Sequence, residues 1–200
     1  MKSTQTLPEN YRCIGSIDLL NNTSALLQLN LWGLVLFVLS AGLFTVILFA
    51  LRTEDIRQGL VLGISGIGGV VQAILVVLAV TAAMIVLHEA AHGVCFWIFT
   101  GAAPKFAFKG AYAYAAAPDW YLPKYAYLVA ALAPLVLLSL VGVALMLVVP
   151  PGAFVVLLLF LVTNASGAIG DLWVVGWLLR QPDSCYANDH GDAVSLYVKR

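Results

Sequence analysis

The chain has 200 residues, of which 62% are hydrophobic and 10% are charged, and its formal net charge is zero. Because soluble domains carry about 25% charged residues, this composition predicts an integral membrane protein. The charge balance provides no basic surface for nucleic acid, so we expect no nucleic-acid partner. The three cysteines are odd in number and far apart, so they predict neither a disulfide framework nor a Cys-x-x-Cys zinc site.

The first long apolar stretch predicts a membrane-spanning helix over residues 26–51. It is long enough to cross about 30 Å of hydrocarbon, and a charged group ends it: Arg52, Glu54, Asp55 and Arg57. About thirty mixed polar residues precede it, and we do not expect a secretory signal there. Without an internal repeat or a low-complexity linker, the sequence predicts a single membrane-embedded domain over residues 1–200.

Residues 59–99 are almost entirely apolar. A straight helix of that length would measure about 60 Å, which is too long for one crossing. Its first part is interrupted by four glycines: Gly63, Gly66, Gly68 and Gly69. We therefore expect residues 59–69 to form a re-entrant or interfacial piece and the second span to cover residues 70–100. Two full spans are the alternative, although no polar turn separates them.

A polar, aromatic segment at 101–124 precedes a third span, expected at residues 125–149. Pro150-Pro151-Gly152 predicts a tight turn, and a fourth span follows at residues 154–179. A polar tail then runs to Arg200. The predicted fold class is an all-α integral membrane protein with about four transmembrane helices.

The basic residues are distributed unevenly between the two sides of the membrane. Four spans place both termini and segment 101–124 on one side, which carries eight basic residues: Lys2, Arg12, Lys105, Lys109, Lys124, Arg180, Lys199 and Arg200. The other side carries Arg52 and Arg57. Because cytoplasmic loops carry the excess of Lys and Arg, we expect both termini in the cytoplasm.

The second span contains His88-Glu89-Ala90-Ala91-His92. Two histidines four residues apart lie on the same face of a helix, and that spacing lets both imidazoles reach one zinc ion. Glu89 then lies beside the metal as a candidate general base. Burying these groups in lipid is costly, so they indicate a functional site. The alternative is a structural polar cluster that joins helices.

A catalytic zinc usually takes three protein ligands and a water. Outside the His-Glu pair, Asp171 is the acidic residue that lies within a predicted span. It precedes the end of its span by about as many residues as His92 precedes the end of its own, so the two share nearly the same depth. Asp171 is therefore the predicted third ligand. Its alternative role is a hydrogen-bonding group between packed helices.

Three further residues have a chemical interpretation and a simpler structural one. Asn164 shares a helix face with Asp171 and could donate a hydrogen bond to an oxyanion, or serve as a packing amide. Cys95 lies on the His88 face, where it is a candidate ligand or a small core residue. His190 lies in Asn188-Asp189-His190-Gly191-Asp192, which is rich in possible ligands but also typical of a solvated turn.

Segment 105–117 alternates aromatic residues with Ala and Lys, and Gly110 lies between its two halves. This pattern predicts a short hairpin. A strand with a free edge can hold an extended peptide by main-chain hydrogen bonds, so Gly110, Tyr112 and Tyr114 are candidate substrate-binding residues. Alternatively, the aromatic side chains belong to the interfacial belt of the membrane.

The layout resembles the intramembrane zinc metalloproteases of the site-2 protease type. It resembles more closely a small family of prokaryotic membrane proteins of the zincin peptidase type, a domain of unknown function. The resemblance covers most of the chain and rests on the following pieces: the His88–His92 motif, Gly110-Ala111-Tyr112-Ala113, Ala133-Pro134, Asn164 and Gly170-Asp171. It implies one zinc ion bound by His88, His92 and Asp171, with Glu89 activating water, in a prokaryotic plasma membrane.

The sequence therefore predicts a zinc-dependent intramembrane peptidase. Its expected partners are the lipid bilayer and a membrane protein or membrane-associated peptide as substrate. The main alternative is a non-catalytic membrane zinc protein, either a carrier, a sensor or an adaptor. A carrier needs polar groups along a path through both leaflets, and the outer halves of these spans offer almost none.

Overall fold

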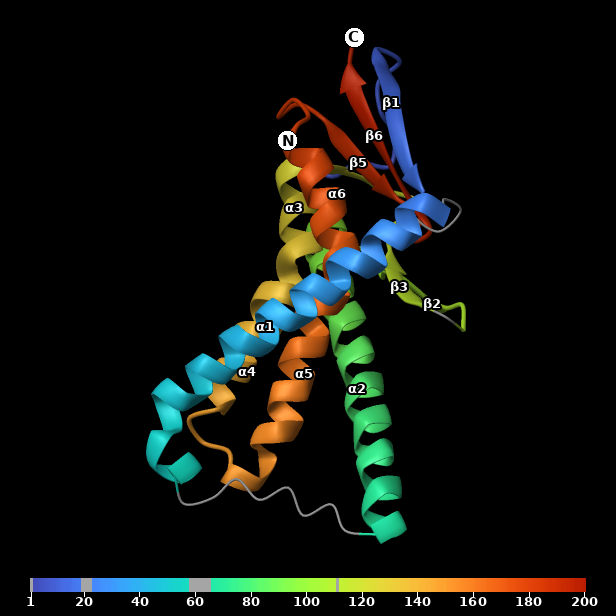
Figure 1. Cartoon of the computed structure of the whole chain (residues 1–200). Helices are drawn as coiled ribbons and strands as arrows, with labels where there is room; N and C mark the ends of the chain where they lie inside the picture. Colours follow the sequence, from blue (N-terminus) through green and yellow to red (C-terminus); the bar gives the residue numbers. More distant parts are fainter. Residues whose placement is uncertain (1, 19–22, 58–65, 111) are drawn as a thin grey trace.

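The computed structural model describes residues 2–18, 23–57, 66–110 and 112–200. Figure 1 shows a bundle of long helices with a small β-sheet at one end, and both termini lie at that end. In the part of the chain that the structure describes, four helical stretches are long and apolar enough to cross a membrane: Ser24–Ile56, Gly66–Thr100, Lys124–Leu145 and Pro151–Leu179. The predicted number of spans is confirmed, and the protein is of the multi-pass membrane type.

Helix α1 (Thr23–Arg57) continues past its predicted end at residue 51. The chain kinks at Arg52, whose φ of −134° and ψ of 38° are not helical. The Arg52 guanidinium donates hydrogen bonds to the main-chain oxygens of Met146 and Val149, at 2.9 and 3.1 Å. These bonds tie the end of the first span to the end of the third, so the charged residues bend the helix instead of ending it.

Helix α2 (Gly66–Thr100) is continuous, which contradicts the alternative of two spans for the described part of this stretch. Gly66 begins it with a φ of +63°, a conformation that is readily accessible to glycine. The expectation that the glycines interrupt the chain is wrong for Gly68 and Gly69, which lie in the first turn. The predicted re-entrant piece before Gly66 lies outside the described residues.

The third span is a composite. Helix α3 (Lys124–Ala133) passes into a π-helical turn, Pro134–Leu138, and then into α4 (Ser139–Leu145). Proline has no main-chain N–H and cannot continue the α-helical hydrogen-bond pattern, so the irregular turn begins at Pro134. The carbonyl four residues earlier, that of Ala130, therefore receives no hydrogen bond from Pro134. The predicted turn after this span is confirmed as a 3₁₀ turn, Pro151–Ala153.

The fourth span is two helices rather than one. Helix α5 (Phe154–Gly167) and helix α6 (Ile169–Leu179) meet at Ala168, whose ψ of 6° departs from the helical value. Asp171 consequently lies in the first turn of α6 and not in the middle of a continuous helix. The sequence carries a glycine on either side of this break, at 167 and 170, but did not by itself predict it.

The hairpin predicted in segment 105–117 is confirmed. Strands β2 (Lys105–Phe108) and β3 (Ala113–Ala116) pair in antiparallel fashion, with Lys105 opposite Ala116. Gly110 lies in the connection with a φ of +80°, which explains why glycine is suited to that position.

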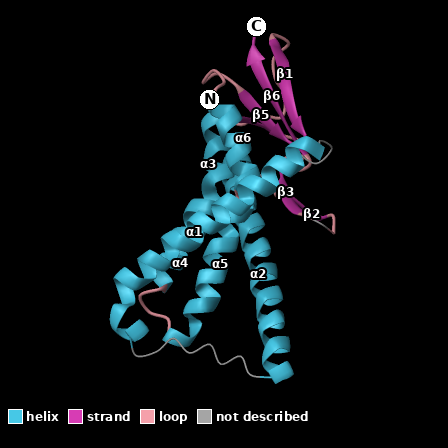
Figure 2. Ribbon diagram, viewed as in Figure 1, coloured by secondary structure: helices cyan, strands magenta, loops and turns pink. Residues whose placement is uncertain are grey.

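The all-α class is wrong for the two ends of the chain. Among the described residues, a four-stranded antiparallel sheet has the order β1-β6-β5-β4. Its strands are β1 (Tyr11–Asp18), β4 (Tyr121–Pro123), β5 (Tyr186–Asp189) and β6 (Ala193–Lys199). In β6, the alternate residues Val194 and Leu196 are buried, as period-two geometry requires. The predicted polar tail is thus a strand pair, and Figure 2 shows these strands gathered at one end of the helices.

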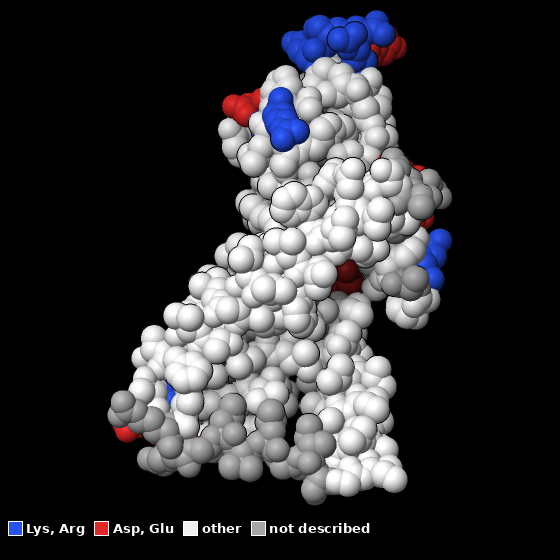
Figure 3. All heavy atoms as spheres, in the orientation of Figure 1, with Lys and Arg blue, Asp and Glu red and all other residues white. Residues whose placement is uncertain are grey.

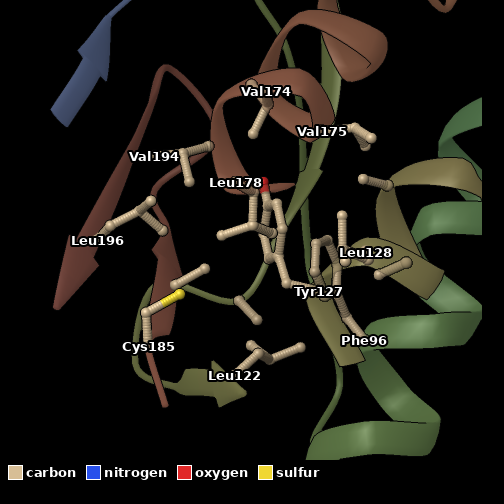
Figure 4. Packing of buried hydrophobic residues seen from close by; sticks show 14 of the residues in the cluster. Phe96, Leu122, Tyr127, Leu128, Val174, Val175, Leu178, Cys185, Val194 and Leu196 are labelled. Carbon is tan, nitrogen blue, oxygen red and sulfur yellow. The ribbon is translucent and has the colours of Figure 1, made fainter. Parts of the chain in front are cut away.

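A hydrophobic core beneath the sheet packs the sheet against α2, α3 and α6 (Figure 4). Its largest buried side chains include Phe96, Leu122, Leu128, Leu178 and Leu196. Figure 3 shows that Lys and Arg gather at the sheet end while the helical body is largely uncharged. This distribution fits a helical part in lipid and a sheet outside it.

Lys124 provides a test of how the sheet end is held together. Only 4% of this residue is exposed, and its Nζ donates to the Gln181 oxygen at 2.6 Å and to Asp183 at 3.0 Å. Lys124→Met should lower the stability in detergent by about 2 kcal/mol, because a buried main-chain acceptor loses a charged donor. Thermal melting of the purified variant measures this. Lys105→Met is the control, since Lys105 pairs with Asp119 at the surface, and equal melting temperatures for the two variants would contradict the account.

Candidate functional site

His88 and His92 are buried on the inner face of α2, with 7% and 9% exposure. The α-helix places them one turn apart, and their ring centroids are 5.1 Å from each other. Their rings contact Ala130 of α3, Asn164 of α5 and Asp171 of α6. The spacing seen in the sequence is therefore realised as a pair of adjacent imidazoles within the bundle.

Asp171 meets both imidazoles from α6. Its Oδ2 lies 3.1 Å from Nε2 of His88, and its Oδ1 lies 3.3 Å from Nε2 of His92. The break at Ala168 starts α6 just before this residue and so directs its carboxylate at the histidine pair. The equal depth inferred from the sequence is confirmed as direct contact between the side chains.

The other ring nitrogens fix the tautomer of each histidine. Nδ1 of His92 lies 2.8 Å from the carbonyl oxygen of Ala130, and Nδ1 of His88 lies 3.0 Å from Oδ1 of Asn164. Both partners can only accept, so each neutral ring donates from Nδ1 and carries its lone pair on Nε2. The Ala130 carbonyl is the one that Pro134 cannot satisfy, which explains how a main-chain acceptor becomes available to a side chain.

Three lone-pair donors therefore face one another. The Nε2 atoms of His88 and His92 and a carboxylate oxygen of Asp171 all lie within 4.8 Å of each other. Such an arrangement needs a proton or a metal ion between the donors. Ligands about 2.0 Å from a tetrahedral zinc lie about 3.3 Å apart. The distances from the Asp171 oxygens to the two Nε2 atoms, 3.1 and 3.3 Å, are close to this value, so the donor set fits a zinc ion.

Of the two roles considered for Asn164, a donor to a substrate oxygen and a packing amide, its contacts in the structure fit the second. It is fully buried, its Oδ1 accepts from His88, and its Nδ2 donates to the Pro134 oxygen at 3.3 Å. Both ends of its amide are engaged within the bundle, which does not suit a donor to a substrate oxygen. Its contacts instead orient His88, as partners of metal-ligating histidines commonly do.

Glu89 lines the same cavity as the histidine pair and contacts the hairpin. Its Oε2 accepts a hydrogen bond from the main-chain N–H of Ala115 in β3, at 2.7 Å. In an antiparallel strand, successive main-chain groups point to opposite edges. The Tyr112 oxygen accepts from Lys109 on the β2 side, so the groups of Ala113 and Ala115 lie on the outer edge, next to Glu89.

A cavity of about 350 Å³ contains these groups. Its polar lining comes from α2, α3, α6, the hairpin, the end of β5 and the turn that follows it: His88, Glu89, His92, Tyr127, Asp171, Tyr112, Tyr114, Asp189 and Asp192. The predicted residues Tyr112 and Tyr114 are therefore brought to the site. Gly110 is not, because it lies exposed in the hairpin turn.

Three polar residues of this lining were not assigned to the site from the sequence: Tyr127, Asp189 and Asp192. Tyr127 of α3 donates to Oδ2 of Asp189 at 2.6 Å, and burial raises the pKa of the Asp189 carboxyl. Asp192 accepts a hydrogen bond from the Tyr112 hydroxyl at 2.7 Å, and this bond raises the pKa of Tyr112 to about 12. The segment that holds both acids was interpreted as a solvated turn, since its pairing with β6 could not be anticipated.

The two alternative ligands named from the sequence lie elsewhere. His190 is exposed, although its neighbour Asp189 lines the cavity. Cys95 packs against the core beneath the sheet. Neither belongs to the group of potential ligand atoms that the structure brings together within the described residues.

A family comparison covers most of these elements. Residues 81–186 match the model of a family described as "Putative zincin peptidase", which is more than half of the chain, and the chain belongs to this family. No curated protein and no solved structure matches the chain. The matched segment contains His88, Glu89, His92, Asn164 and Asp171, and it ends before the turn that carries Asp189 and Asp192. The family description indicates a metallopeptidase.

Proposed function

We propose that this protein is a membrane-embedded zinc peptidase that hydrolyses peptide bonds of membrane proteins or membrane-associated peptides. The convergence of two imidazole nitrogens and a carboxylate oxygen at one point, in a cavity that also contains Glu89, is the observation that carries this proposal. It agrees with the family description.

In this proposal His88, His92 and Asp171 hold one zinc ion and leave one position open, as in other catalytic zinc sites. Bound zinc supplies Lewis-acid polarisation of a carbonyl and lowers the pKa of water toward 7. The Ala130 carbonyl and the Asn164 amide keep both Nε2 atoms aimed at the ion by accepting from Nδ1. Asn164 is thus a positioning residue rather than a group that contacts substrate.

Glu89 is the general base of the proposed reaction. It takes a proton from the attacking water and passes it to the leaving amine. Its hydrogen bond to the Ala115 N–H holds the carboxylate between the histidine pair and the outer edge of β3. A scissile peptide bond at that edge therefore lies within reach of the base.

The substrate binds in extended form along β3. Ala113 offers its main-chain groups and Ala115 its main-chain oxygen on an edge that β2 does not cover, while the Ala115 N–H stays with Glu89. An added strand would be held there by main-chain hydrogen bonds. A helical segment of a membrane protein must unwind to bind in this way, which exposes its peptide bonds to the site. Tyr112 and Tyr114 then form one wall of the substrate cavity.

Substitution of Asp171 tests whether this residue, and not His190 or Cys95, is the third zinc ligand. We expect Asp171→Ala to weaken zinc binding by at least roughly 10–100-fold, measured by chelator competition and by metal analysis of the purified protein. His190→Ala and Cys95→Ala are the controls and should retain about one zinc per chain. Normal zinc affinity in Asp171→Ala with loss in His190→Ala would place the third ligand in the C-terminal segment instead.

Replacement of the base should separate metal binding from catalysis. Glu89→Gln should keep about one zinc per chain, because the imidazoles and Asp171 are unchanged, and should lose cleavage of a quenched-fluorescence library of extended decapeptides. Glu9→Gln, an exposed position, is the matched control and should cleave like the wild type. Cleavage by a folded Glu89→Gln protein would refute the enzymatic mechanism and favour a non-catalytic zinc protein.

The orientation in the membrane is also proposed: the sheet and both termini face the cytoplasm, because their end of the molecule carries most of the Lys and Arg. Cys13 is exposed on β1 and serves as a natural probe. In a Cys95→Ala, Cys185→Ala background, a thiol reagent should label Cys13 in intact cells only when the reagent crosses the membrane. Gly152→Cys, at the opposite end in a chain with Cys13→Ser, should react with an impermeant reagent, and the reverse pattern would invert the orientation.

A further inference from the structure

The β2–β3 hairpin is attached to the C-terminal strand pair as well as to Glu89. The Tyr112 hydroxyl donates to Oδ1 of Asp192 at 2.7 Å, and Nζ of Lys109 lies 4.0 Å from Oδ2 of the same carboxylate. Asp192 lies in the connection between β5 and β6, about 80 residues along the chain from Tyr112. The Asp192 carboxylate therefore contacts one residue before the hairpin turn and one after it.

The packing around this contact is close. Gly191 has a φ of +87°, and a Cβ built on it would lie 2.2 Å from Cε2 of Tyr114. The Tyr114 ring therefore lies directly on the Gly191 backbone, where no side chain fits. The rings of Tyr112 and Tyr114 also stack, with centroids 6.3 Å apart, so the hydrogen bond and the ring contact hold the same strand.

The turn that carries Asp192 is itself fixed to the membrane part. Asp189 accepts from the Gly191 N–H at 2.7 Å and from the Tyr127 hydroxyl at 2.6 Å. Tyr127 belongs to α3, the helix whose Ala130 carbonyl orients His92. A chain of hydrogen bonds thus runs from α3 through the β5–β6 turn to the hairpin that borders the cavity.

We propose that Asp192 is a positioning residue of the candidate active site: through Tyr112 it fixes the hairpin so that the outer edge of β3 lies beside Glu89. This inference rests on the proposed function, and it assigns a role to a segment beyond the residues 81–186 that match the family. A hydrogen bond to a carboxylate is stronger than a neutral one, and Tyr112 keeps its proton as donor because its pKa is raised to about 12.

The inference predicts a specific kinetic pattern. Without the anchor the hairpin is less ordered in the free enzyme, so extended substrate binds less well. Once substrate is bound, β3 is held against it and Glu89 keeps its contact with Ala115. Asp192→Ala and Tyr112→Phe should each raise KM roughly tenfold, in line with the loss of one charge-assisted hydrogen bond, and should change kcat less than about twofold. The double variant should equal Asp192→Ala, because Asp192→Ala already removes the bond that Tyr112→Phe removes.

Amide hydrogen exchange of the hairpin gives a second readout that needs no substrate. In the zinc-loaded protein in detergent, Asp192→Ala and Tyr112→Phe should each speed exchange of residues 105–116 roughly tenfold. Asp192→Asn keeps an acceptor oxygen and should restore most of the protection. Asp119→Ala is the matched control, since it removes the partner of Lys105 at the exposed end of the same hairpin, and it should leave exchange and KM as in the wild type.

KM and kcat are measured with the quenched-fluorescence decapeptides described for Glu89→Gln. Unchanged exchange in Asp192→Ala, additive effects in the double variant, or a fall in kcat at constant KM would overturn the inference. A wild-type protein that cleaves no peptide would overturn the proposed function instead, while the exchange measurement would still decide whether the anchor exists.

Discussion

The rest of the structure depends on one constraint: two imidazoles and a carboxylate at membrane depth must satisfy one another. Ionisable groups in lipid are costly unless they are paired, and His88, His92 and Asp171 converge from two helices to do so. Two irregularities permit this convergence. The break at Ala168 aims Asp171 at the pair, and Pro134 leaves the Ala130 carbonyl for His92. Each irregularity lowers local helix stability, and each serves the same cluster.

The part outside the helices extends this arrangement. The hairpin borders the site and donates a hydrogen bond to Glu89 from the Ala115 N–H at its outer edge. The strand pair formed by the C-terminal segment contributes Asp189 and Asp192 to the lining of the cavity and contacts the hairpin through Asp192. Lys124 joins the start of α3 to the end of α6 beneath the sheet. The apolar helices and the sheet therefore meet at the candidate site, where the chemistry is proposed.

Local sequence patterns predict most of the candidate site. Apolar runs predict the spans, the four-residue spacing predicts the imidazole pair, and equal distance from the span ends predicts the depth of Asp171. The hairpin follows from its alternation around Gly110. The sheet could not be predicted, because β1 pairs with β6 across almost the whole chain and a short polar strand carries a weak signal alone. The role of Asn164 depended on which neighbours its amide meets, which spacing along one helix does not specify.

The central claim is that the cavity holds a zinc ion with two imidazoles and the Asp171 carboxylate as its protein ligands. X-ray absorption spectroscopy at the zinc edge of the purified protein tests this most directly. The account predicts four nitrogen or oxygen neighbours at about 2.0–2.1 Å, with the outer-shell scattering typical of two imidazoles, and a changed spectrum in Asp171→Ala. A sulfur neighbour at about 2.3 Å, or a spectrum that Asp171→Ala leaves unaltered, would contradict it.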